Sequence, residues 1–184
     1  MTENLGYSPK DIRFGDDGRA KLISGITKIA GAVKSTLGPR GNTVLIESAN
    51  HTSGITVKKD GVTVAKAVDL LDPVENLVVR MMKEAADRTA TNAGDGTTTA
   101  IVLTEALVKA GDELITPGLN RIQVLRHMVE ISDEVVESLK KKKKKVTKKM
   151  LNDVATISAN NDKNIGGIIS RVYNEIGTNG IVTV

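Results

Sequence analysis

The chain has 184 residues, of which 40% are hydrophobic and 26% charged, the balance of a globular protein with one domain or one domain and part of another. Aromatic residues amount to only 2%, which argues against base-stacking nucleic-acid readers, and the absence of cysteine excludes disulfides, thiol catalysis and zinc sites with cysteine ligands. No apolar run approaches the roughly 18 residues of a membrane span, and the N-terminus has no signal-peptide core. We therefore expect a cytoplasmic protein with an aliphatic core and no membrane contact.

Residues 10–15 alternate polar and apolar side chains before a glycine, which predicts a short strand. Apolar residues then recur along 22–37 at the spacing of one helical face, so we expect a helix that Asp16 or Asp17 caps and that Gly38 and Pro39 end. Residues 43–47 and 55–58 are short and rich in β-branched side chains, which predicts a hairpin. A turn at 59–61 and a short helix over 62–68 should follow.

Helices dominate the remainder of the chain. Pro73 suits the first turn of a helix that ends in the stretch 91–96, and another begins at Thr97 and ends at 116–118. Helical patterns also start near Asn120 and cover 150–157 and 165–176, and a strand is expected at 181–184. These elements predict a mainly α fold with one small hairpin. The faces expected to be buried are Val74, Leu77, Val78, Met81 and Ala85 in the third helix; Ile101, Leu103, Leu107, Val108 and Leu114 in the fourth; and Ile122, Leu125, Val129, Val136 and Leu139 in the fifth.

The net charge of +4 comes from one segment, residues 140–149, which contain eight lysines; removing them leaves −4 for the rest of the chain. A lysine-rich helix end is most simply a solvated face that complements the negative end of the helix dipole. Attraction to an anion, a membrane surface or a nucleic acid, and a sequence artefact or decayed gene, are the other interpretations. We do not expect nucleic acid to be a partner.

The segment GDGTTT at residues 94–99 lies where a loop enters a helix. Glycines let a ligand approach the backbone, and free N–H groups at a helix N-terminus favour phosphate. The hydroxyls of Thr97, Thr98 and Thr99 add donors, and Asp95 could hold a Mg²⁺ that bridges phosphates. The alternative is an ordinary helix cap.

Two other loops are weaker candidates. Residues 36–41, TLGPRG, could wrap a ligand after a helix ends, or could simply be a helix stop and turn. Lys59, Asp60 and Gly61 place a cation and a carboxylate on one turn, which could equally be a surface turn. Neither the Walker A pattern nor a Gly-x-Gly-x-x-Gly strand–helix motif occurs, so a nucleotide would not be bound by either common phosphate loop.

Together, VKSTLGPRG (33–41), KKDGVTVAK (58–66) and AGDGTTTA (93–100) resemble, in order and spacing, the N-terminal part of the group I chaperonins, the GroEL type. KDIRFGDD (10–17) is similar to the family's first strand and helix start. TISANND (156–162) and NGIVTV (179–184) are similar to its entry into the intermediate domain. The resemblance covers the chain from Lys10 onward.

The resemblance implies an equatorial domain, N-terminal part, over residues 1–142 and the start of an α+β intermediate domain over 143–184. It implies a site for ATP, Mg²⁺ and K⁺: Thr36, Leu37, Gly38 and Pro39 for the base, sugar and α-phosphate side, Lys59 as a further contact, and Gly96, Thr97, Thr98 and Thr99 as the phosphate cradle. Asp95 matches the Mg²⁺ ligand, and Asp60 matches an acidic residue near the γ-phosphate, the catalytic candidate.

The resemblance also implies partners: other chaperonin subunits in a homo-oligomeric ring, unfolded protein clients, and a co-chaperonin lid. Family members are much longer, and we expect the apical domain, the C-terminal equatorial part and the water-activating carboxylate to be absent from this chain. The hairpin tip and the lysine-rich linker also depart from the family pattern. One hypothesis is therefore an ATP-dependent folding machine or its N-terminal piece. Another is a non-hydrolysing module that joins or modulates rings, and a third, a small nucleic-acid-associated protein, has only the lysines in its favour.

Overall fold

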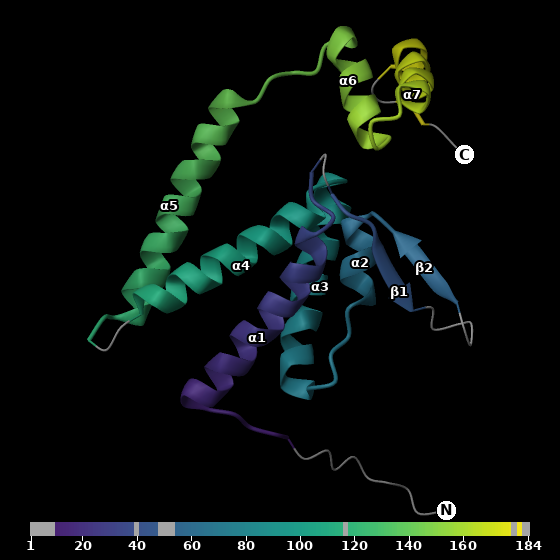
Figure 1. Cartoon of the computed structure of the whole chain (residues 1–184). Coiled ribbons are helices and arrows are strands. Elements are labelled where there is room, and N and C mark those ends of the chain that lie inside the picture. The colour runs from purple at the N-terminus through teal and green to yellow at the C-terminus, as the bar shows by residue number, and fades with distance from the viewer. Residues whose placement is uncertain (1–9, 39–40, 48–53, 116–117, 178–179, 182–184) are drawn as a thin grey trace, which may run out of the picture. The chain divides into compact units, whose positions relative to one another are not determined.

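The computed structural model describes residues 10–38, 41–47, 54–115, 118–177 and 180–181. In these residues the chain forms seven helices and one antiparallel hairpin, so the predicted mainly helical fold with one small hairpin is confirmed (Figure 1). The elements are α1 (Gly15–Lys34), β1 (Val44–Glu47), β2 (Ile55–Lys58), α2 (Gly61–Ala67), α3 (Pro73–Ala93), α4 (Thr97–Leu114), α5 (Arg121–Lys142), α6 (Lys148–Ser158) and α7 (Lys163–Ile176).

The chain divides into two compact units, residues 1–125 and 126–184. The domain boundary that we expected at residue 142 stays a prediction. Among the described residues, no helix combines the length and the apolarity that crossing a membrane would require.

The core of the first unit forms where α1, α3 and α4 pack against one another and against α2. Its largest fully buried side chains are Ile29, Val33, Val64, Val79 and Ile101. Burying one such aliphatic side chain contributes about 1.5–3 kcal/mol. The buried hydrophobic residues are isoleucine, valine, alanine and methionine, as the scarcity of aromatic residues predicted.

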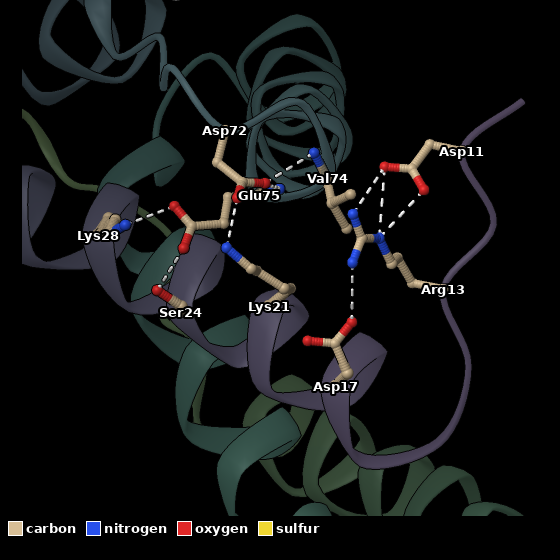
Figure 2. A network of polar contacts seen from close by, with 9 residues as sticks. All are labelled: Asp11, Arg13, Asp17, Lys21, Ser24, Lys28, Asp72, Val74 and Glu75. Atoms are coloured by element: carbon tan, nitrogen blue, oxygen red, sulfur yellow. Dashed lines mark hydrogen bonds and ion pairs between the residues drawn. The ribbon is translucent and has the colours of Figure 1, made fainter.

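A polar network fixes α1 against α3 (Figure 2). Asp72 caps α3 by accepting hydrogen bonds from backbone amides, including that of Glu75 at 3.1 Å, and pairs with Lys21 of α1. The hydrogen bond from Lys21, aided by these amides, lowers the pKa of Asp72 to about 2. The buried Glu75 carboxylate accepts from Lys28 and from Ser24 Oγ at 2.8 Å, and these contacts, Lys28 first, hold its pKa below the ordinary value.

The hairpin lies beside α2 (Figure 1). Leu45 pairs with Val57 and Glu47 with Ile55, and the apolar members of this face are exposed: Leu45 by 68%, Ile55 by 68% and Val57 by 59%. Val44 and Ile46 point the other way and pack on the core. The hairpin thus presents a free apolar face, while its tip, residues 48–53, lies outside the described residues.

In the second unit, α6 packs against α7. Gly166 of α7 is buried, and a Cβ atom there would lie 2.6 Å from Thr156 Cα and 2.7 Å from Thr156 N. The two helices therefore approach backbone to backbone, which only glycine permits.

The strand predicted at residues 10–15 is wrong: residues 10–14 have no regular structure, and Gly15 begins α1. A single strand leaves its N–H and C=O groups unpaired, and among the described residues β1 and β2 pair only with each other. Of the strand predicted at 181–184, Ile181 is not in a strand, and 182–184 lie outside the described residues.

The predicted buried faces are confirmed at Val78 of α3 and Ile101 of α4 and are wrong at most of their other positions. In α3 the buried residues are one position further along, Glu75, Val78, Val79, Met82 and Ala86, because the helix carries two apolar stripes and periodicity cannot choose between them. In α4 the stripe through Thr97, Ile101, Glu105 and Gly111 is buried, whereas Leu103, Leu107 and Leu114 are exposed. No residue of α5 is buried, so its apolar stripe faces solvent in this structure.

Candidate functional site

The three loops singled out from the sequence meet at Gly61. A Cβ atom at this buried position would overlap Thr98 Oγ1 and would lie 3.2 Å from Thr36 Oγ1. The end of α1, the start of α2 and the start of α4 are therefore packed together, and contacts among these three helices maintain the arrangement. Residues far apart in the chain thus form one polar site, and glycine at position 61 is what allows it.

The first wall of the site is the turn that leaves α1. Thr36 is buried, and its hydroxyl donates to the Val33 carbonyl at 2.8 Å. Gly38 has a φ of 77°, a left-handed conformation that favours glycine, and Leu37 is exposed beside it. The turn closes where the Asn42 amide donates to the Ser35 carbonyl at 2.6 Å. Pro39, also expected here, lies outside the described residues.

Asp60 forms the N-cap of α2. Its carboxylate accepts from the amides of Val62 at 3.2 Å and Thr63 at 3.0 Å, and from the Thr63 hydroxyl at 2.5 Å. Partial burial raises the pKa of Asp60, but these hydrogen bonds and the charge of Lys58 outweigh it, so the pKa lies below its ordinary value. The site therefore has a fixed negative charge beside the exposed Lys59.

The third wall, residues 94–99, enters α4 through two left-handed glycines, Gly94 with φ 74° and Gly96 with φ 90°. No side chain caps the start of α4, so the amides of its first turn, in Thr97, Thr98 and Thr99, have no capping acceptor. Asp95 does not serve as a cap, because its Oδ1 accepts from the adjacent Gly96 amide at 2.6 Å. Its exposed carboxylate thus lies next to uncapped helix donors.

Glu105 is a site-supporting residue that sequence reasoning missed. It is 4% exposed on α4, and its carboxylate pairs with Lys34 near the end of α1 and with Lys109 Nζ at 2.7 Å. Burial alone would raise the pKa of the Glu105 carboxyl. Hydrogen bonds and positive charge from both lysines lower this pKa by more than burial raises it, so the net pKa lies below the ordinary value. The spacing of Thr97, Ile101 and Glu105 along one helical face is the sequence signal that could have found it.

The donor set determines which ions the site can accept. No three His, Cys, Asp or Glu side chains gather as a metal site in the part of the chain that the structure describes. Mg²⁺ usually keeps several waters and binds through one or two carboxylates together with substrate phosphates. Asp95 beside a phosphate-binding helix start fits that requirement, so the residues present fit Mg²⁺ delivered with a phosphate ligand.

Comparison with protein families matches residues 29–180 to the TCP-1/cpn60 chaperonin family, and the chain belongs to that family. Two crystal forms of the chaperonin gp146 from the bacteriophage EL 2 (Pseudomonas aeruginosa), both in the presence of ATP-BeFx, are similar in structure with a TM-score of 0.78. They are 31% and 32% identical over 88% and 89% of this chain. A group III chaperonin in the open state is 25% identical over 87% of the chain, with a TM-score of 0.71. The chain spans only 28% to 32% of the length of these chaperonins.

Proposed function

We propose that this chain is the nucleotide-binding part of an ATP-dependent chaperonin subunit that assists protein folding. The observation that carries the proposal is the meeting of the three loops at Gly61, since it brings Thr36, Thr98 and Asp60 to one place. The presence of ATP-BeFx in the crystals of the gp146 chaperonin supports nucleotide as the ligand.

In this proposal the uncapped amides and hydroxyls of Thr97, Thr98 and Thr99 hold the phosphates, with Gly96 allowing close approach. A helix N-terminus supplies only about half a positive charge. Lys59 adds a cation, while Mg²⁺ held by Asp95 would neutralise the remaining phosphate charge. Thr36, Leu37, Gly38 and Pro39 are assigned to the base, sugar and α-phosphate side of the nucleotide. K⁺ would bind together with the nucleotide, and no residue is assigned to it.

Asp60 is the acidic residue that we place near the γ-phosphate. Because its pKa is lowered, it is a weak proton acceptor at neutral pH. We therefore assign it the orientation of the reacting groups by hydrogen bonds and charge, the kind of contribution that dominates phosphoryl transfer. A chain with only these residues should hydrolyse ATP negligibly.

A second candidate function is a non-hydrolysing module that joins or modulates chaperonin rings. The exposed apolar face of the hairpin supports contact with other subunits, because an unpaired strand edge with apolar side chains favours association. A chain that stays monomeric at high concentration in light scattering would reject this alternative. The first proposal also includes unfolded protein clients, a co-chaperonin lid and a cytoplasmic location.

The proposal that the chain belongs to group I rests on the sequence segments quoted above, because the similar structures include a group III chaperonin.

The test is nucleotide titration of the full chain with and without Mg²⁺. Asp95→Ala should abolish the Mg²⁺-dependent part of the affinity and leave helix content unchanged. Glu84→Ala, which removes an exposed carboxylate of α3, is the control and should bind like the wild type. Equal Mg²⁺-dependent affinities of the wild type and Asp95→Ala would reject the metal-ligand role. No binding by the wild type would reject nucleotide binding by this chain alone.

A further inference from the structure

The most concentrated charge of the molecule is the lysine tract, residues 140–149, with eight lysines. The tract contains the last residues of α5, the connection 143–147 and the first two residues of α6. Every residue in it is exposed. The tract is thus a basic segment that is exposed along its whole length.

Little in the described structure neutralises this charge. Lys140 Nζ lies 2.6 Å from Glu137 Oε1, and the other seven lysines of the tract form no ion pair within the described residues. Like charges at this density repel one another.

The fold itself gains nothing from the lysines at the start of α6. Lys148 and Lys149 occupy its first turn, which contains no acidic residue, and the helix dipole disfavours cations there. A solvated helix end, the simplest interpretation of the sequence, accounts for the lysines that end α5 but not for those that begin α6.

The chemistry of the tract matches a linear polyphosphate backbone. The part of the tract outside the helices, residues 143–147, can follow such a backbone, because an extended chain advances about 3.3–3.6 Å per residue and phosphates along one strand of a duplex follow one another every 3.4 Å or so along the axis. The tract contains no aromatic side chain that could stack on a base, and Val146 is its only apolar residue, too little for insertion into a lipid surface. Contrary to the expectation from the sequence that nucleic acid is not a partner, we propose that the lysine tract binds the phosphate backbone of nucleic acid without reading its sequence.

The salt dependence of binding follows from the geometry. A phosphate strand approaches the tract from one side, so about half of the eight exposed lysines, about four, can face it. Each phosphate contact contributes about −0.9 to the slope of log K against log salt, which gives a slope of about −3.6. The affinity should therefore fall on the order of a hundredfold between about 50 and 200 mM salt.

The experiment measures fluorescence anisotropy of two short labelled DNA duplexes of unrelated sequence with the full chain. The expected result is equal affinity for both, a Kd of about 10⁻⁴–10⁻⁶ M at physiological salt, and the slope given above. Replacement of the six lysines 140–145 by glutamine should abolish binding at physiological salt, whereas replacement of the same six by arginine should preserve it; circular dichroism verifies the fold of both variants.

Three outcomes would overturn the proposal. One is binding by the glutamine variant equal to that of the wild type. Another is a salt slope near zero, or no measurable binding of the wild type at physiological salt. The third is tighter binding to vesicles of mixed neutral and anionic phospholipid than to DNA at equal phosphate concentration, which would identify a membrane surface as the ligand instead.

Discussion

Gly61→Ala tests the packing that unites the three loops. Its methyl group would overlap Thr98 Oγ1 and lie 3.3 Å from Thr98 Cβ. Overpacking a tight site costs about 1–3 kcal/mol. Alanine would recover up to about 0.5–1 kcal/mol by its better helix propensity. The balance predicts that Gly61→Ala lowers the free energy of unfolding by about 0–2.5 kcal/mol, centred on about 1 kcal/mol.

The assay is urea unfolding of the full chain, followed by circular dichroism. Gly31→Ala is the matched control, because Gly31 also lies in a helix but has no neighbouring atom within 4 Å of a new Cβ. It should raise the free energy of unfolding by about 0.5–1 kcal/mol. The two glycine substitutions should thus have opposite signs, and only the packing around Gly61 explains the difference.

A double-mutant cycle identifies the atom responsible. Thr98→Ala removes the hydroxyl that the new methyl group would meet, so Gly61→Ala should cost about 1 kcal/mol less in that background. If Gly61→Ala stabilised the chain as Gly31→Ala does, or if its cost were the same with and without Thr98, the three loops would not pack as described.

Two further predictions concern acid stability and the second unit. The pKa of Asp72 is about 2 in the folded chain against an ordinary value of 3.8, so its carboxylate stabilises the fold fully above pH 3.8, and this contribution is lost as pH falls toward about 2. Urea unfolding of Asp72→Asn, which cannot titrate or pair with Lys21 as a charge, should depend less on pH in that window; an unchanged pH dependence would contradict the assignment. Gly166→Ala should loosen α6 from α7, because its Cβ would meet the Thr156 backbone, whereas Gly167→Ala, with open space around it, should not. Amide hydrogen exchange in α6 measures the difference, and equal protection in both variants would refute it.

The elements of the site could be predicted from the sequence because their chemistry is local. Glycines at 94 and 96 adopt the left-handed conformations that such a loop needs, and the threonines after them begin a helix, as expected. What the sequence could not indicate is that Gly61 packs against Thr98, since this depends on how α2 and α4 are held by the core between them.

Burial was harder to predict than helix position. In α3, Leu77 and Met81 are as apolar as the buried Val78 and Met82. The sequence therefore predicts two possible buried faces, and packing against the neighbouring helices determines which of them is buried. In α4 the buried stripe contains Glu105, whose charge two lysines compensate. A search for apolar residues at helical spacing cannot find a buried glutamate. The strand predicted at residues 10–15 does not form, because alternation of polar and apolar residues does not supply a second strand to pair with.

The pairing of Glu105 with Lys34 and Lys109 has a consequence for evolution of this chain. A neutral residue at position 105 would leave two ammonium groups facing each other across α1 and α4 with no anion between them, and loss of both lysines would leave a buried carboxylate uncompensated. Substitutions at these three positions should therefore be correlated among homologues. A relative with a neutral residue in place of Glu105 is expected to have lost at least one of the two lysines, and one that retains the glutamate should retain a cation at position 34 or 109.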